Sequence, residues 1–313
     1  MIKKNALKRI LITTLAFIIV SIIYLFPNSY SKNTIEEKVA FENISKTTIY
    51  IPNKDDYVSR TSLISKTKDI RNQIKEIIEY LTIGSINNDY IPNIFYPIIP
   101  KNTKLLSLDL NNQLLKINFS KEFLNIKKGQ ERLLLESLIY SLTEFKEIKE
   151  IIIFVEGDLL NKLPNTNEVL ENPLKRNIGI NKKYNINSVK NTSKITTYYI
   201  AKDDDLTYYI PITTVGNFSE EKIEVIINRL KSSPVYETNL HSYLQANTEL
   251  LEYEVLQDKI SLSFNNYIFD DFDKQNILEE VKYSIGLSIK DTYNINTVLF
   301  NVGDKLIEEF KII

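Results

Sequence analysis

The sequence repeats itself once at a long offset, and this repeat sets the main limit on what the chain can fold into. Several stretches of the first half recur in the same order between roughly 145 and 149 residues later. A solenoid would repeat about every 20–45 residues, so this period indicates a duplicated domain instead. The matched stretches are 48–51 with 197–200, 104–106 with 249–251, 115–119 with 260–264 and 154–158 with 300–304.

The first copy has apolar residues spaced for strands in some segments and for helices in others. Leu106, Leu108 and Leu110 alternate with polar residues, which predicts a half-buried strand. Thr67 is a candidate N-cap for a helix whose isoleucines fall on one face. Asn111 and Asn112 suit a tight turn. The predicted strands are 47–51, 106–110, 115–119 and 151–155, and the predicted helices are 68–81 and 130–145.

The second copy repeats this order of elements. Ser219 and Asp273 are the candidate caps of its two helices, a strand pair spans 250–264, and 297–302 is the last strand. Each copy therefore has the order βαββαβ, with two helices on one face of a small sheet. The predicted fold class is α+β, with two such modules in tandem after an N-terminal transmembrane helix.

The stretch between the modules predicts a loose connection. It contains Pro164 and Pro173 among many Asn and Lys residues, and it has no apolar period. The predicted division is 1–30 as cytoplasmic stub and anchor, 31–46 as tether, 47–160 as first module, 161–194 as linker and 195–313 as second module.

The N-terminus is typical of a single membrane anchor. Lys3, Lys4, Lys8 and Arg9 precede an uncharged apolar run over residues 10–26. Basic flanks stay in the cytoplasm, so the bulk of the chain is expected outside the cell membrane. A cleaved signal peptide is the alternative.

Several stretches resemble the GerMN domain of sporulation and germination proteins. The first copy carries Ile-Pro-Lys-Asn-Thr-Lys-Leu-Leu at 99–106, Ile-Asn-Phe-Ser-Lys-Glu-Phe at 117–123, a helix over 138–145 and Phe-Val-Glu-Gly at 154–157. The second copy keeps the strand pair and the last Phe-x-x-Gly but is otherwise divergent. Asn102 stands where the family commonly has Gly.

The resemblance implies a fold like the ring-building motifs of secretion systems. It also implies a place in the envelope of a spore-forming bacterium, between mother cell and forespore, near channel components. Family members are often lipoproteins. This chain has no cysteine to acylate, so its anchor would be residues 10–26.

The sequence offers little for catalysis or metal binding. A hydrolase needs a base for its nucleophile, and the one histidine, His241, stands alone without a nucleophile elbow. Without cysteine the chain has no thiolate ligands. Formal net charge is −1, which removes the usual electrostatic basis for nucleic-acid binding. We therefore expect no enzyme activity, no catalytic, cofactor-binding or metal-binding residues, and no cofactor.

The acidic and aromatic clusters admit both a functional and a structural interpretation. Two carboxylates could support glycoside chemistry, and exposed aromatic rings could bind a glycan or a protein. The structural alternatives are a cap at Asp273, a solvated turn at 203–205, and rings that cover a sheet. The residues concerned are Asp270, Asp271, Asp273, Asp203, Asp204, Asp205, Glu122, Glu156, Tyr198, Tyr199, Tyr208, Tyr209, Tyr90, Phe95 and Tyr96.

Two functions from different classes follow. The preferred one is a scaffold that assembles other envelope or sporulation proteins through edge strands and helix faces, because duplication without a catalytic constellation favours multivalent binding. The alternative is a protein that binds or modifies peptidoglycan. A sensory extracytoplasmic domain is a third, weaker possibility.

Overall fold

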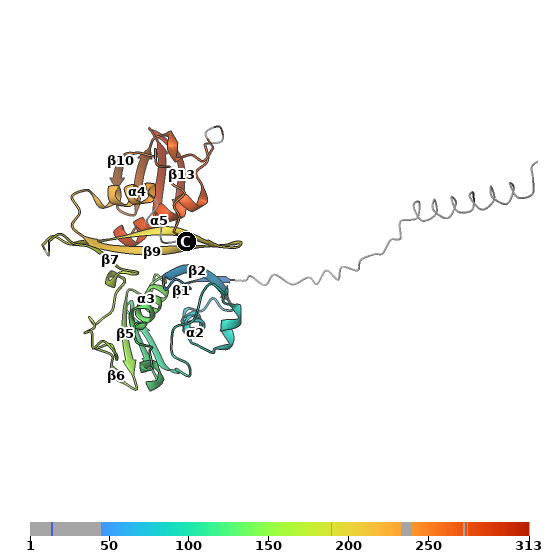
Figure 1. The fold of residues 1–313 in the computed structure, drawn as a ribbon, viewed down its shortest axis with the longest axis vertical. Helices are drawn as coiled ribbons and strands as arrows, with labels where there is room; N and C mark the ends of the chain where they lie inside the picture. The colour runs from blue at the N-terminus through green and yellow to red at the C-terminus, as the bar shows by residue number, and fades with distance from the viewer. Residues whose placement is uncertain are drawn as a thin grey trace, which may run out of the picture. The chain divides into compact units, whose positions relative to one another are not determined.

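The two copies of the repeat meet in a β-sheet to which both contribute strands (Figure 1). This computed structural model describes Thr14 and residues 45–312, without 189, 233–239, 272 and 274. Within the shared sheet, β9 pairs with β8 along one edge and with β2 and β7 along the other. Its five strands are β1 (Ser45–Pro52), β2 (Val58–Ser65), β7 (Lys183–Asn185), β8 (Ser193–Asp203) and β9 (Leu206–Gly216).

Each copy also has a four-stranded sheet of its own. The two central strands of each sheet are parallel, and the outer strands pair with them in antiparallel fashion. One sheet contains β3 (Leu105–Asn111), β4 (Leu114–Phe119), β5 (Glu150–Val155) and β6 (Asp158–Leu159). The other contains β10 (Leu250–Val255), β11 (Lys259–Phe264), β12 (Thr297–Val302) and β13 (Lys305–Lys311).

Helices fill the space between the shared sheet and each four-stranded sheet (Figure 1). The α-helices are α2 (Ile70–Leu81), α3 (Glu131–Leu142), α4 (Lys222–Lys231) and α5 (Glu279–Tyr293). The 3₁₀ turns are η1 (Ile86–Tyr90), η2 (Lys121–Leu124), η3 (Arg176–Ile178) and η4 (Asn266–Ile268). The α3 helix packs on β1 and α5 packs on β8. Ten of the twelve residues of α3 are buried, because it is covered on both sides.

The tandem α+β organisation is confirmed, but the predicted order βαββαβ is wrong. Each copy has a strand hairpin where one strand was predicted, and another strand follows its last predicted one. The four residues that open β2 are all buried, so the strand lacks the alternation that marks a half-buried strand. The hairpins also leave their own module to form the shared sheet. The predicted module, with two helices on one small sheet, is therefore incomplete, because it lacks the hairpin that each copy contributes to the shared sheet.

Three predicted helix caps are also wrong. Asp69, not Thr67, caps α2, and its Oδ1 accepts a hydrogen bond from the Asn72 amide. The α4 helix begins after Glu221 instead of Ser219. The α5 helix begins after Leu278, so Asp273 lies outside it. Each prediction placed the cap too early, and before α5 the apolar residues Ile277 and Leu278 were counted as part of the helix.

A β-bulge changes which leucines of β3 are covered. The register with β4 shifts between Leu105 and Ser107, so Leu105 is half-buried and Leu106 is 46% exposed. The prediction that Leu106 lies on the covered face is therefore wrong, since a bulge inserts one residue and exchanges the faces before it. Leu108 and Leu110 lie on the covered face as expected.

The segment 161–194 is packed, contrary to the loose linker predicted from its composition. Leu163, Leu174 and Ile180 are buried in it. The Asn181 side-chain amide donates to the carbonyls of Val58 and Pro211, and its oxygen accepts from the Val58 amide. Asn181 thereby joins β2 to β9. The described parts of this segment are structural elements of the junction between the modules.

Gly216 allows β7 to lie close to β9. A Cβ at this position would lie 2.6 Å from the Asn185 carbonyl oxygen, which is part of the backbone. Gly216→Ala is therefore expected to lower the free energy of unfolding by about 1–3 kcal/mol, as overpacking generally does. Urea unfolding of the two proteins measures this. An unchanged midpoint would show that β7 moves away freely.

The predicted anchor, residues 10–26, lies outside the described residues except for Thr14. So do the stub and nearly all of the tether. In the described part of the chain, no helix combines the length and apolar character needed to cross a membrane. Residues 45–313 form a compact unit that does not include residues 1–44.

Candidate functional site

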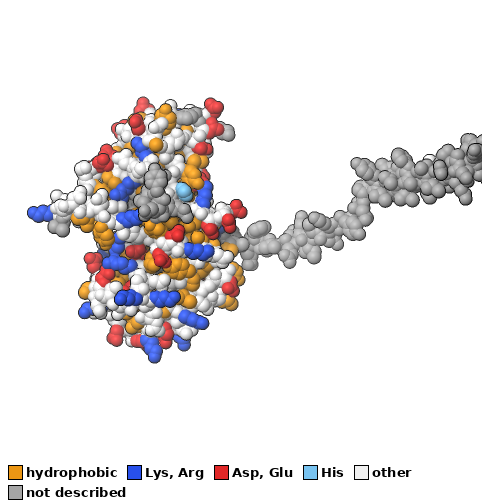
Figure 2. Space-filling view, in the orientation of Figure 1, with side chains coloured by type: hydrophobic (Ala, Val, Ile, Leu, Met, Phe, Trp, Pro, Cys, Tyr) orange, Lys and Arg blue, Asp and Glu red, His pale blue; other side chains and the backbone are white. Residues whose placement is uncertain are grey.

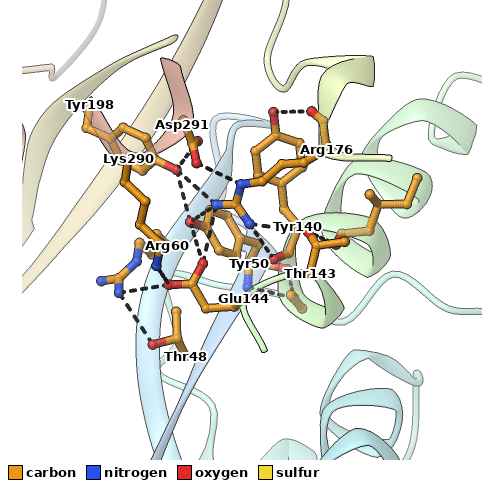
Figure 3. A network of polar contacts seen from close by, with 12 residues as sticks. Thr48, Tyr50, Arg60, Tyr140, Thr143, Glu144, Arg176, Tyr198, Lys290 and Asp291 are labelled. Atoms are coloured by element: carbon orange, nitrogen blue, oxygen red, sulfur yellow. Dashed lines mark hydrogen bonds and ion pairs between the residues drawn. The ribbon is translucent and has the colours of Figure 1, made fainter. Parts of the chain in front are cut away.

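Two tyrosine hydroxyls meet where the modules join, and a network of polar side chains surrounds them (Figure 3). The hydroxyls of Tyr50 on β1 and Tyr198 on β8 are 2.9 Å apart, although the residues are 148 positions apart in sequence. Both side chains are fully buried. The centre of the junction is thus formed by one residue from each copy of the repeat.

The contacts around the two tyrosines are equivalent in the two modules. The Tyr50 amide donates to Ser141 Oγ at 2.8 Å, and the Tyr198 amide donates to Ser288 Oγ at 2.9 Å. These serines lie on α3 and α5, which cover the outer edges of β1 and β8. The Tyr198 hydroxyl also donates to Asp291 Oδ2 at 2.6 Å. The structural equivalent of Tyr50 is therefore Tyr198, one residue earlier than the sequence alignment predicts.

Arg176 occupies the centre of the junction without an equivalent in this network. Its Nε donates to Asp291 Oδ1 at 2.7 Å, and its Nη2 donates to the Tyr50 hydroxyl at 2.6 Å. Its guanidinium carbon lies 4.3 Å from the ring centroid of Tyr140. Arg176 lies in η3, within the predicted linker, so a residue of the connection holds both modules.

A carboxylate of the first module joins three cations. Glu144 Oε1 lies 2.7 Å from Lys290 Nζ and 3.3 Å from Arg60 Nη2, and Oε2 lies 3.3 Å from Arg176 Nη2. Burial alone would raise the pKa of Glu144, but these cations outweigh it and lower the pKa to about 2. Burial raises the pKa of Tyr50, so its hydroxyl stays protonated and able to donate.

The lowered pKa of Glu144 predicts a loss of stability in acid. The ordinary pKa of the side chain is 4.5, so its contribution is complete above that pH and is lost as the pH falls towards 2. Glu144→Gln should therefore be less stable at pH 7 and should lose less stability between pH 4.5 and 2. Urea midpoints across this range test it, with Glu147→Gln, an exposed glutamate, as control. Parallel curves for Glu144→Gln and the unaltered protein would contradict the expectation.

The network suits a structural role. Each charged group in it faces an opposite charge, and Tyr50, Tyr198 and Arg176 are joined by hydrogen bonds. Nucleophilic catalysis needs a base beside a nucleophile, and in this network Arg60, Arg176 and Lys290 are engaged with carboxylates. The arrangement fixes how the two modules are placed.

The acidic residues and the histidine singled out from the sequence lie apart from this network. His241 is exposed, and its backbone pairs with Ile200. Asp204 and Asp205 form the turn of the β8–β9 hairpin, as the solvated-turn interpretation expects. Asp271 Oδ1 accepts a hydrogen bond from the Asp273 amide, which makes a local turn near exposed Asp270.

The two glutamates of the family-like stretches stabilise loops. Glu122 accepts a hydrogen bond from the Ser120 hydroxyl at 2.5 Å, and this bond is the main cause of the lowered pKa of Glu122. Glu156 accepts from the Lys121 amide at 2.9 Å. Residues 101–105 of the stretch 99–106 line a cavity of about 530 Å³ beside α2, with Lys75, Glu79, Lys101 and Lys104 on its walls.

Most of the tyrosines considered for ligand binding are inside the protein. Tyr198, Tyr199 and Tyr208 are buried, and Tyr208 packs edge-on against buried Phe95. Tyr209 and Tyr96 are partly buried. Only Tyr90 of this set is exposed, at 56%. The interpretation that the aromatic rings cover the sheet therefore holds for most of these residues. On the face shown in Figure 2, side chains of both charges are interspersed.

Each four-stranded sheet has an edge strand that carries a β-bulge at the same position. In β3 the register shifts between Leu105 and Ser107, and in β10 it shifts between Leu250 and Glu252. The residue inside each bulge is an exposed leucine, Leu106 at 46% and Leu251 at 59%. On the outer edges of β1 and β8 a helix serine bonds to the strand backbone. The four-stranded sheets end in β6 and β13 on one side, and on the other side in β3 and β10, which carry the exposed leucines. The strands β3 and β10 are the candidate binding edges.

Comparisons with known proteins agree on the family. Residues 48–161 match the family model Germane, described as sporulation and spore germination. The spore germination protein GerM of Bacillus subtilis (strain 168) is 28% identical over 264 residues, which cover 82% of this chain and 71% of that protein. A solved structure of the tandem GerMN domains of Bacillus subtilis GerM superposes with a TM-score of 0.77 at 26% identity, covering 86% of this chain and 97% of that one.

Proposed function

Because the chain belongs to the GerMN-domain family and carries the domain twice, we propose that it is a membrane-anchored extracytoplasmic scaffold of sporulation or spore germination. Its partners would be other envelope proteins. Family membership supports the role in sporulation or germination. Residues 10–26, with their basic flank, support a single-pass anchor with the N-terminus inside.

The observation that carries the scaffold role is the pair of open edges at β3 and β10. An edge strand offers unpaired backbone groups to an extended segment of another protein, and neighbouring side chains add specificity. Leu106 and Leu251 supply an exposed apolar anchor at the same position of each edge. A duplicated module thus presents the same kind of site twice.

The rigid junction makes the two edges work as a pair. Tyr50, Tyr198 and Arg176 hold the modules in one arrangement, so the distance between the edges is fixed. A partner assembly with matching spacing would bind both edges, and its second contact would form at a high effective concentration. This is the physical advantage of two modules over one.

Substitution of the two edge leucines tests the proposal. Leu106→Lys and Leu251→Lys should each weaken capture of the partners from sporulating cells about tenfold, because a buried apolar contact becomes a buried charge. The double variant should weaken it by about a hundredfold or more. Quantitative recovery of crosslinked partners from cells that carry each variant is the measurement.

Val169→Lys is the matched control, since Val169 is 71% exposed and lies outside the open edges. It should leave partner recovery unchanged. Equal recovery with the double variant and with the unaltered protein would exclude the edges as binding sites. Extraction of the full chain from membranes at alkaline pH tests the anchor separately, and release into the supernatant would exclude it.

A further inference from the structure

Exposed apolar side chains gather at one end of the first module. Ile86 is 80% exposed, Tyr90 is 56% exposed and Ile64 is 50% exposed. Ile86 and Tyr90 begin and end η1, and Ile64 lies near the end of β2. Side chains of this kind are normally scattered singly over a surface, so their proximity points to a contact site.

Contacts link the end of β2 with η1. Lys66, two residues after Ile64, holds its Nζ 5.3 Å from the ring centroid of Tyr90. The Tyr80 hydroxyl donates to the Ile64 carbonyl, and Asn88 of η1 donates to the Tyr80 carbonyl. The end of β2 and η1 are thus linked through α2. We name Ile64, Lys66, Ile86 and Tyr90 the η1 surface.

The neighbourhood of the η1 surface is basic. Lys46 pairs with Ile64 across the two strands, and Lys68 and Arg71 follow nearby; all three are exposed. Two of the nearby acids serve the fold, because Asp69 caps α2 and Glu76 bonds to Ser65. Asp89 is the exposed acid within η1. A hydrogen-bonded carboxylate keeps its charge, and α2 also exposes Lys75 and Glu79, the latter bonded to Asn87 of η1. Five cations therefore stand against four acids, which leaves a positive balance of one charge.

The start of the first strand indicates what this surface faces. Ser45 pairs with Ser65, so the chain enters the described unit at the end of β2 that carries the η1 surface. The proposed anchor ends at residue 26, which leaves about 18 residues and a maximum span of about 65 Å. The η1 surface is therefore close, along the chain, to the membrane that would hold the protein.

We propose that the η1 surface docks on the anionic lipid surface of the membrane that anchors the chain. Tyr90 and the isoleucines would enter the headgroup region, where amphipathic rings and apolar side chains are favoured. The neighbouring cations would be attracted to anionic headgroups. The position of this membrane relative to the protein rests on the anchor proposed above.

Vesicle binding by residues 45–313, which form a unit of their own, tests the docking. This fragment should sediment with vesicles of phosphatidylglycerol and phosphatidylcholine, and less with phosphatidylcholine alone. Ile86→Ser with Tyr90→Ser should reduce the bound fraction at least tenfold, and Lys66→Glu should reduce it and weaken its salt dependence. Val169→Ser with Tyr184→Ser, two equally exposed residues elsewhere, is the control and should bind as the unaltered fragment does.

The outcomes separate the docking from the anchor. Equal binding by the η1 double variant and its control, or no binding to anionic vesicles, would overturn the docking. Sedimentation with purified cell wall but not with vesicles would overturn it too and assign the surface to a wall polymer. Alkaline extraction of the full chain concerns residues 10–26 alone, so the anchor could fail while vesicle binding by the fragment persists.

Discussion

Arg176→Met should lower the free energy of unfolding by about 3 kcal/mol, since removing one partner of a buried ion pair leaves the other uncompensated. Arg176 is the ion-pair partner of Asp291, whose side chain is 3% exposed. The variant also loses hydrogen bonds to Tyr50, Tyr198 and the Tyr140 carbonyl. Methionine keeps much of the volume, so the loss reports mainly on charge and hydrogen bonding. Urea unfolding followed by tyrosine fluorescence measures it.

An exposed ion pair provides the comparison. Arg132 lies 2.7 Å from Glu168, but both side chains are more than a third exposed. Arg132→Met should therefore cost less than about 1 kcal/mol. Adding Asp291→Asn to Arg176→Met should recover part of the loss, because the stranded charge is removed. If Arg176→Met costs no more than Arg132→Met, Arg176 does not hold the junction.

Deletion of the second module, residues 195–313, should destabilise the first module by roughly 5 kcal/mol, a large share of the 5–15 kcal/mol typical of a protein. The deletion removes Lys290 from Glu144, Asp291 from Arg176 and β9 from β2. It also exposes the fully buried Tyr50. The melting temperature of fragment 45–194 should lie more than about 10 °C below that of fragment 45–313.

The shortened fragment should also self-associate, because the deletion opens the edge of β2. Light scattering measures this. Removal of residues 1–44 is the control deletion and should leave the melting temperature unchanged, since the compact unit begins at Ser45. If fragment 45–194 is monomeric and has the same melting temperature as fragment 45–313, the modules fold independently. In that case the deletion variant could also be used to test partner capture. If the deletion destabilises the first module, as expected, point substitutions are the better test of partner binding.

Strands with one covered face were predictable from the sequence. In β4 the side chains of Leu115, Ile117 and Phe119 are buried and alternate with less buried ones, and its bounds agree with the prediction within a residue. The β12 strand has the bounds predicted for it. The α2 helix buries Ile74, Ile77 and Leu81 on one face as its spacing indicates. Local periodicity is therefore enough to predict an element that has one face buried and the other exposed to solvent.

In the shared sheet, β1 was predicted as strand 47–51, but β2 and β9 could not be found in that way. The middle of β9 is buried at consecutive positions, and it contains Pro211, which normally argues against an interior strand. Pro211 faces Tyr198 of β8, and the Tyr198 amide bonds to Ser288 of α5, so no bond of the ladder needs an N–H at the proline. On the other side Asn181 donates to the carbonyls of Pro211 and Val58 and so joins β9 to β2. This contact links residues from three distant segments. A local pattern carries no information about it.

The composition of the chain contains one indication that Arg176 has a special role. Only six of the 39 basic residues are arginines, so this chain uses arginine sparingly. Two of them, Arg60 and Arg176, lie in the junction. A planar guanidinium with five donors suits several acceptors at once, which lysine cannot match. Rare arginines in a lysine-rich chain are therefore worth examining as network residues.

The single guanidinium between Tyr50 and Tyr198 has a consequence for how such a protein can arise. Two identical, separate subunits would present every residue twice across a twofold axis. Two arginines would then compete for one central position, each repelling the other. Fusion of the copies into one gene removes that restriction, because each half can mutate alone. Two modules in one chain can therefore share a single arginine between their two tyrosines, as Arg176 is shared here. A symmetric homodimer of the same modules could not.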